Sequence, residues 1–199
     1  AVYGIDNTFA SRAVEQGVLA TGTTSRAPEE FALEGEGADQ LAPIDYSDVC
    51  INVDDTWFKG NKVASPTSLD DLTKADYKGL VALPGATTSS PGLAFLLTTI
   101  AAKGDAWPDY WKQLLANDVA ITSGWSEAYE GQFTQGGGNG QRPIVLSYSS
   151  SPPFTIGDDG KATTSALLDT CFRQVEYAGV LEGSSNTAGA KAFIEFMQS

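Results

Sequence analysis

Two hydroxyl-rich segments of the sequence have the composition of a binding site for polar or charged groups. The first is 84–92, in which Ser89 and Ser90 precede Pro91 and a predicted helix. Because Pro91 suits the first position of a helix and Ser90 can cap it, free backbone amides and serine hydroxyls would converge where the helix dipole is positive. Such a loop can receive an anion or polar oxygens, although the same spacing is also typical of an ordinary capped helix. It matches neither a Walker loop nor a G-x-G-x-x-G loop.

The second hydroxyl-rich segment is Ser147-Tyr148-Ser149-Ser150-Ser151-Pro152-Pro153, at the end of a predicted strand. Its serines can surround a polar ligand beside the tyrosine ring, or they form a solvent-exposed loop. Trp125 lies at the start of a predicted helix that follows another strand. A tryptophan and a tyrosine at neighbouring strand ends can hold a planar cation between them, at roughly 0.5 to 2 kcal/mol per cation–π contact. Packing of Trp125 in the core is the alternative.

The composition excludes most hydrolytic enzymes. None of the 199 residues is a histidine, so Ser-His-Asp and Cys-His catalysis and imidazole metal ligands are excluded. No other nucleophile stands beside a base. We therefore predict a protein with no catalytic residues, no metal and no cofactor, which holds a small polar or cationic ligand without changing it. An enzyme of unfamiliar type is the alternative.

The charge of the chain argues against two kinds of partner. The chain has 25 acidic and 12 basic side chains, a net charge of −13, which repels nucleic acids and anionic lipid surfaces. Its apolar runs, such as 93–102, are about half of the roughly 20 residues that cross a bilayer. We expect no nucleic-acid partner and no membrane insertion. The N-terminal residues do not resemble a signal peptide, so we expect any export signal or lipid anchor to lie outside this sequence.

The two cysteines, Cys50 and Cys171, are too few for a structural zinc site and lack C-x-x-C spacing. They are either two buried thiols or a disulfide in an exported protein, and the residues alone leave both alternatives open.

Hydrophobic periodicity and turn residues predict alternating strands and helices. The predicted strands are 1–5, 49–53, 80–83, 119–122, 144–148 and 171–180; the predicted helices are 7–17, 68–79, 91–103, 105–117, 123–135 and 186–198; the predicted loops are 21–39 and 136–140. This order predicts an α/β fold with a largely parallel sheet flanked by helices, in which ligands bind at the carboxyl ends of the strands. The loops after positions 83, 122 and 146 are therefore the candidate site.

Several stretches, in this order along the chain, resemble the thiamine-binding solute receptors of bacterial ABC importers. They are Gly4-Ile5-Asp6-Asn7, Asp45-Tyr46, Ser89-Ser90-Pro91-Gly92-Leu93, Gly124-Trp125-Ser126-Glu127-Ala128-Tyr129, Leu146-Ser147-Tyr148 with Ser151-Pro152, Gln174-Val175-Glu176, and Phe193 with Phe196-Met197. The tryptophan motif followed by the Leu-Ser-Tyr motif is the most specific pair. The sequence departs from the family in having serines at 90, 149 and 150, where many members have threonine, and in the glycine-rich insert 136–141.

The resemblance implies a periplasmic-binding-protein fold of type II-like organisation, present here as a fragment because members are longer at both ends. It implies a three-layer α/β lobe with a mixed, mostly parallel sheet flanked by helices. Residues 1–46 would be a portion of the first lobe, 47–172 the second lobe with hinge strands at its ends, and 173–199 a return strand and helix. In this topology Cys50 and Cys171 would lie close enough to bridge.

The resemblance also implies the function. The protein would be the extracytoplasmic, periplasmic or membrane-associated component that binds thiamine or its phosphates and delivers the ligand to a membrane permease. Ser89, Ser90, Trp125, Tyr148, Ser149, Ser150 and Ser151 match ligand-contacting positions of the family. A receptor for another small cation, such as a polyamine, is the alternative.

Overall fold

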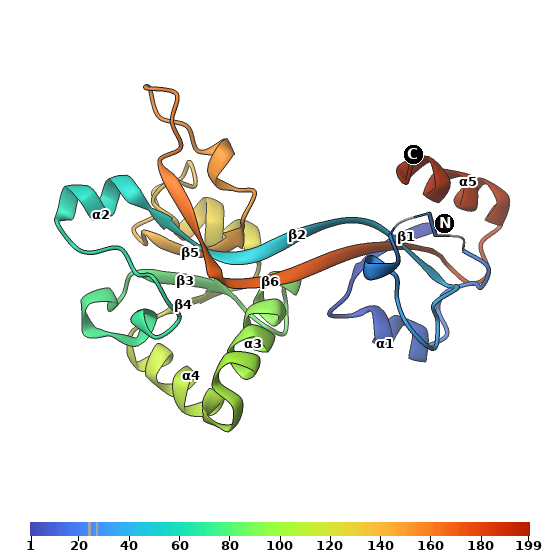
Figure 1. Cartoon of the computed structure of the whole chain (residues 1–199), viewed down its shortest axis with the longest axis horizontal. Helices are drawn as coiled ribbons and strands as arrows, with labels where there is room; N and C mark the ends of the chain where they lie inside the picture. Colours follow the sequence, from blue (N-terminus) through green and yellow to red (C-terminus); the bar gives the residue numbers. More distant parts are fainter. Residues whose placement is uncertain (24, 27) are drawn as a thin grey trace. The chain divides into compact units, whose positions relative to one another are not determined.

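The computed structural model describes residues 1–23, 25–26 and 28–199 (Figure 1). Two compact units are present, one formed by residues 1–46 with 174–199 and the other by residues 47–173. Two long strands, β2 (Leu41–Asp54) and β6 (Thr164–Val180), have residues in both units.

The strands form one mixed sheet with the order β1-β6-β2-β5-β3-β4. In the unit 47–173, β3 (Val81–Pro84) pairs in parallel with β4 (Ala120–Thr122) and with β5 (Ile144–Tyr148), while β5 pairs antiparallel with β2. Helices flank the sheet, which confirms the predicted α/β class. The carboxyl ends of β3, β4 and β5 meet at one edge, where the sequence predicts the candidate site.

The unit 47–173 has its main core between the sheet and two helices, α3 (Ser90–Lys103) and α4 (Trp107–Ala116). Phe95 and Leu114 are fully buried there. Trp111 packs on Phe95 edge to face and donates its indole N–H to Thr99 over 2.8 Å. Tyr110 and Leu114 place one face of α4 in this core, although Leu115 stays exposed.

The unit 1–46 with 174–199 contains β1 (Val2–Asp6), which pairs antiparallel with β6, and the helices α1 (Ala10–Glu15) and α5 (Thr187–Met197). Asn186 caps α5 by accepting a hydrogen bond from the Gly189 amide over 2.9 Å. The predicted loop 21–39 contains one 3-10 turn, Glu29–Phe31. Positions 24 and 27 of that prediction lie outside the described residues.

Three predicted helices differ from the structure. The segment 68–79 forms two 3-10 turns, Asp71–Thr73 and Ala75–Tyr77, instead of a helix. The carbonyls of Leu72 and Lys74 accept hydrogen bonds from the Asn117 side chain, at 2.9 and 2.8 Å, and this tertiary contact replaces helical bonding.

The other two differences concern the first helix and the helix after β4. The helix predicted from residue 7 begins only at Ala10, because the Asn7 amide extends the sheet pairing by donating to the Val175 carbonyl. In 123–135 the regular part is a π-helix, Glu127–Gln132. None of the helices among the described residues is both long and apolar enough to cross a membrane.

The start of α2 (Asp55–Asn61) depends on a buried carboxylate, Asp54. Its Oδ1 accepts from the Trp57 amide and the Thr56 hydroxyl, and its Oδ2 accepts from Thr134 and Gln135. Burial alone would raise the pKa of Asp54, but these hydrogen bonds outweigh it and hold the pKa below the ordinary value of 3.8. The charged form is therefore stabilised by folding.

We expect Asp54→Ala to lower the free energy of unfolding by roughly 1 to 2 kcal/mol at pH 7, because α2 loses its cap. Since the folded-state pKa is lowered, the contribution of Asp54 is complete above about pH 4 and is lost as the pH falls through the folded-state pKa. Urea unfolding at pH 7 and pH 3 measures both effects. Asp54→Asn is the control, because it keeps a capping oxygen without a titrating group. Equal urea midpoints for Asp54→Ala and wild type at pH 7 would contradict the role.

Candidate ligand-binding site

The first predicted segment lies where α3 meets the end of β3. A Cβ at Gly92 would lie 2.5 Å from the carbonyl oxygens of both Pro84 and Gly85. Only glycine therefore allows the first turn of α3 to rest on the strand end. Ser89 is the capping residue of α3 and Ser90 its first residue, one position earlier than predicted. The Ser89 side chain makes no capping bond, and both serines are partly exposed.

The second segment is linked to Trp125 by a short hydrogen-bonded chain. The Trp125 indole N–H donates to the Ser147 hydroxyl over 3.0 Å, and the hydroxyls of Ser147 and Ser151 lie 2.8 Å apart. Ser147 is fully buried, so its hydroxyl forms hydrogen bonds with Trp125 and Ser151 instead of with water. These hydrogen bonds orient the N–H edge of the Trp125 ring toward β5.

The faces of the Trp125 ring have different surroundings. Tyr129, one turn later, stacks on the indole with ring centroids 4.9 Å apart and 12° between the planes. Tyr129 in turn contacts the buried Phe133, at 5.4 Å. The Tyr148 ring lies 6.4 Å from Trp125 at 46°. Trp125 and Tyr148 are therefore inclined to each other and are not the parallel plates of a sandwich.

The serine run 149–151 is held by β2. The Ser149 amide donates to the Asp48 carbonyl over 2.8 Å, and the hydroxyls of Ser150 and Ser47 lie 3.4 Å apart. Ser151 takes part in the buried chain, whereas Ser150 is exposed. Trp125, Tyr148 and Ser151 thus lie together, while Ser89 and Ser90 share the edge of the sheet without joining that hydrogen-bonded chain, within the part of the molecule that the structure describes.

A glycine-rich segment supports the π-helix that carries Tyr129. Cβ atoms at Gly136, Gly138 and Gly140 would lie 1.7, 2.5 and 2.3 Å from the carbonyl oxygens of Tyr129, Glu130 and Phe133, respectively. These glycines let the segment lie directly against the end of the helix. The glycine-rich composition predicts a loop at 136–140, and this close packing gives its glycines a defined structural role.

Three residues near the site were not among the predicted ligand-contacting residues: Ser147, Tyr129 and Asn52. Ser147 and Tyr129 belong to the two motifs on which the family resemblance rests. Membership in these motifs is the sequence feature that could have indicated them. Asn52 is buried and donates from Nδ2 to the carbonyls of Cys50 and Tyr148, at 3.1 and 3.2 Å. No local pattern in the sequence indicates that β2 supplies this support.

Replacing Ser147 by alanine tests whether the buried chain orients Trp125. We expect Ser147→Ala to weaken binding of the ligand several-fold, because the indole N–H loses its acceptor and the ring its fixed orientation. Calorimetric titration with thiamine measures the effect, and Ser185→Ala, which removes an exposed hydroxyl outside the predicted site, is the control. Equal loss in both variants would show that the buried chain has no special role.

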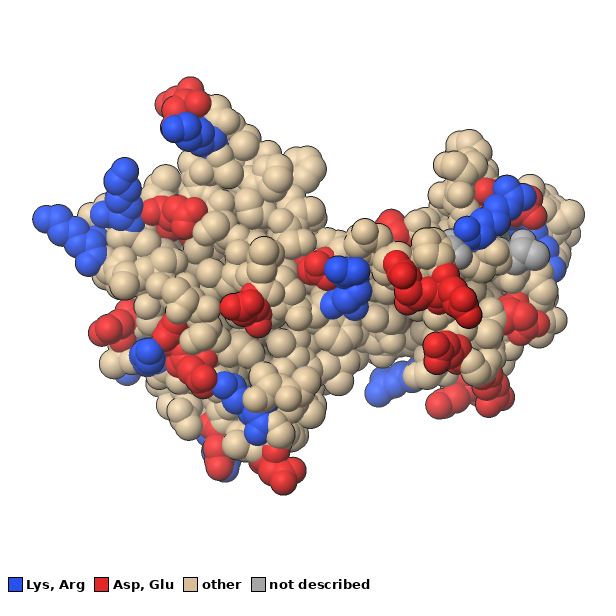
Figure 2. All heavy atoms as spheres, in the orientation of Figure 1, with Lys and Arg blue, Asp and Glu red and all other residues tan. Residues whose placement is uncertain are grey.

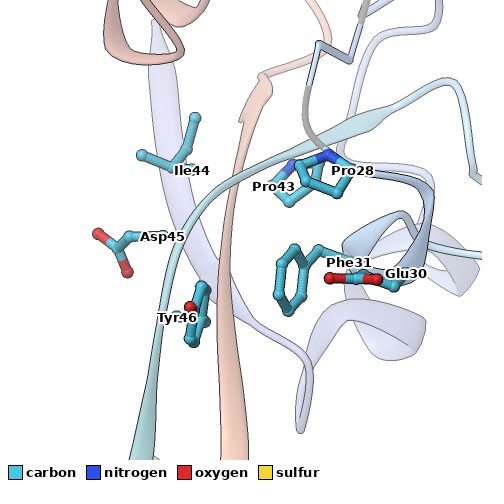
Figure 3. Close-up of a pocket in the computed structure, with 7 residues that line it drawn as sticks. All are labelled: Pro28, Glu30, Phe31, Pro43, Ile44, Asp45 and Tyr46. Carbon is cyan, nitrogen blue, oxygen red and sulfur yellow. The ribbon is translucent and has the colours of Figure 1, made fainter.

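A separate hollow of about 560 Å³ lies in the unit 1–46 with 174–199 (Figure 3). Phe31 and Tyr46 form one side of it, with ring centroids 4.6 Å apart and 17° between the planes. Its lining residues are Pro28, Glu30, Phe31, Pro43, Ile44, Asp45 and Tyr46. None of the predicted ligand-contacting residues is among them.

The disulfide is formed in the structure: Cys50 of β2 is joined to Cys171 of β6, closing 121 residues of chain. Asp48 and Arg173 form a two-bond ion pair between the same strands, with one bond of 3.2 Å from Arg173 Nη2 to Asp48 Oδ2 and a second from Nε to Oδ1. Both links lie near the ends of the unit 47–173.

The sequence of the chain matches the family described as bacterial extracellular solute-binding protein over residues 3–151. The chain belongs to this family. Among curated relatives of this solute-binding protein, the thiamine-binding periplasmic protein of Salmonella typhimurium is 32% identical over 201 residues, covering 100% of this chain and 58% of that protein. The thiamine-binding periplasmic protein of Brucella melitensis is 29% identical, covering 98% of this chain and 56% of that protein.

Solved structures agree with the family. A periplasmic thiamin binding protein superposes with a TM-score of 0.80 at 30% identity, covering 98% of this chain and 59% of that one. A spermidine/putrescine substrate-binding protein from Streptococcus pneumoniae has a TM-score of 0.66 at 16% identity, covering 100% of this chain and 62% of that one, and shows the shared fold. The solute-binding chain described here thus spans slightly more than half the length of these curated relatives.

Proposed function

We propose that this chain is part of the extracytoplasmic component of an ABC importer, which binds thiamine or thiamine phosphate and delivers it to a membrane permease. The observation that carries the proposal is the hydrogen-bonded chain from Trp125 through Ser147 to Ser151, with Tyr148 beside it. These hydrogen bonds bring the tryptophan motif and the Leu-Ser-Tyr motif, which are distant in sequence, together in one surface of aromatic rings and hydroxyl groups. In this proposal the protein is a binding protein without catalytic residues or a cofactor.

The chemistry of the surface suits thiamine, which has two aromatic rings, one of them a permanent cation. The inclined rings of Trp125 and Tyr148 offer faces for such rings. Serine hydroxyls at 149–151, and the α3 start with Ser89 and Ser90, offer donors for a hydroxyl or phosphate end. In the proposed assignment residues 47–172 are the second lobe and residues 1–46 and 173–199 belong to the first.

The experiment is a tryptophan-fluorescence titration of the chain with thiamine and thiamine monophosphate, with the Escherichia coli thiamine-binding periplasmic protein, another relative at 32% identity, as the positive control. We expect saturable quenching that is weaker than in the longer control, because ligand enclosed on fewer sides stays hydrated. No response at millimolar ligand, with a normal response of the control, would contradict thiamine binding.

A polyamine receptor is the second candidate, since a net charge of −13 favours cations generally. Spermidine displacing thiamine at equal concentration would favour it. Turnover of ligand during long incubation, followed by mass spectrometry, would instead indicate an enzyme.

A further inference from the structure

The unit 1–46 with 174–199 carries a disproportionate share of the negative charge. Its sequence contains eleven acidic and three basic side chains, a net charge of −8, against −5 in the larger unit 47–173. Figure 2 shows acidic side chains gathered over the part of the molecule that holds β1 and α1. The field of this unit therefore attracts cations.

Three carboxylates lie on three neighbouring strands of this unit. Asp6 of β1 and Glu176 of β6 are directly opposite each other in the antiparallel pair, so their side chains share one face. Asp45 lies on β2, the strand on the other side of β6. Figure 3 shows its carboxylate pointing away from the Phe31 and Tyr46 rings of the hollow. Like charges placed opposite each other destabilise a sheet, so folding alone does not favour this arrangement.

The other two carboxylates also affect the ionisation of Glu176. Burial raises the pKa of Glu176, the hydrogen bond from Gln174 lowers it, and the charges of Asp6 and Asp45 raise it further. Asp6 is only 5% exposed. Ion pairs between described residues use other carboxylates, and none of them reaches Asp6, Asp45 or Glu176. The group thus carries negative charge without a basic partner from the described residues.

The amide of Gln174 gives an independent indication of a ligand. Gln174 is 4% exposed and lies on the same face of β6 as Glu176, to which its Nε2 donates over 2.6 Å. Its Oε1 is buried and has no hydrogen-bond partner among the residues that the structure describes. A buried acceptor without a partner costs about 1 to 3 kcal/mol, and an N–H donor placed beside Glu176 would supply one.

We propose that Asp6, Asp45, Glu176 and the Gln174 amide form a subsite for a small organic cation that carries N–H donors. The carboxylates would balance its charge and Gln174 Oε1 would accept from one N–H. A metal ion fits less well, because no group of three or more acidic or cysteine side chains among the described residues has an arrangement that could hold one. The subsite shares with the proposed function only the class of ligand, a small cation.

The test is calorimetric titration of the chain with thiamine, putrescine and spermidine. We expect at least one of them to bind, and Glu176→Gln to weaken that binding at least tenfold. Glu182→Gln is the matched control, because it removes the same charge from an exposed residue just after β6, and we expect it to change affinity by less than twofold. We also expect the melting temperature of Glu176→Gln to equal or exceed that of wild type, because one repulsive charge is removed. A purely structural Glu176 would give the opposite shift.

Each outcome decides the subsite separately from the proposed function. If thiamine binding depends on Trp125 but not on Glu176, the subsite is overturned and the proposed function stands. If thiamine fails to bind but putrescine binding is lost in Glu176→Gln, the subsite stands and the thiamine assignment falls. If Glu176→Gln unfolds, Asp45→Asn, at an exposed position, gives the same comparison. Absence of binding by all three cations at millimolar concentration overturns the subsite.

Discussion

Trp125→Ala is expected to weaken thiamine binding well over tenfold. The substitution removes the aromatic face beside Tyr148, and it leaves the buried Ser147 hydroxyl without the indole N–H that donates to it. A lost cation–π contact of about 2 kcal/mol corresponds to roughly thirtyfold in affinity. Calorimetry is the suitable measurement, because the variant also loses part of its fluorescence.

Two matched variants sharpen this test. Trp107→Ala removes a tryptophan of the same unit that lies at the start of α4, outside the aromatic cluster, and should bind as wild type does. Trp125→Phe keeps an aromatic face but not the N–H donor, so its affinity should fall between those of wild type and Trp125→Ala. An unchanged affinity in Trp125→Ala would remove this residue from the site.

The second large effect is expected from the disulfide. Replacing both cysteines in Cys50→Ala/Cys171→Ala should lower the free energy of unfolding by about 4 to 5 kcal/mol, because the bridge closes a loop of 121 residues and restricts the unfolded chain. Urea unfolding of the double variant and of the oxidised wild type measures the difference. The Asp48–Arg173 ion pair remains in both and so does not contribute to it.

Wild type unfolded in the presence of a reductant is the control, and it should match the double variant. An equal urea midpoint for oxidised wild type and the double variant would show that the bridge adds no stability. Intact-mass analysis before and after reduction, which differ by two hydrogens when a bridge is present, confirms the redox state of each sample.

The bounds of strands and helices were predicted best where the buried apolar residues and the residues typical of turns or helix starts indicate the same ends. The strand 144–148 has the predicted bounds because its continuous apolar run is buried on both faces of a central strand. The helix starting near Pro91 followed from the fixed backbone angle of proline. The long strands were underestimated, since the first part of β2 contains Pro43 and Asp45, and the first part of β6 has adjacent Leu167 and Leu168 among polar residues and so lacks a regular alternation.

The site was predictable only in part. Trp125 and Tyr148 could be proposed from motifs and from strand order, and the structure places their rings near each other. The roles of Ser147 and Tyr129 arise from a hydrogen bond and a ring contact that no spacing rule contains. The helix predicted at 68–79 was wrong for the same reason: the side-chain amide of Asn117, distant in sequence, binds two backbone carbonyls of this segment.

The disulfide also determines the products of a single proteolytic cleavage within the unit 47–173. Since Cys50 and Cys171 lie near the two ends of the unit 47–173, most of that unit is a covalently closed ring. A protease that cleaves once in the glycine-rich segment 136–140 would therefore open the ring without releasing a fragment. The two pieces would separate on a gel only after reduction, and a nicked molecule could keep its strands paired.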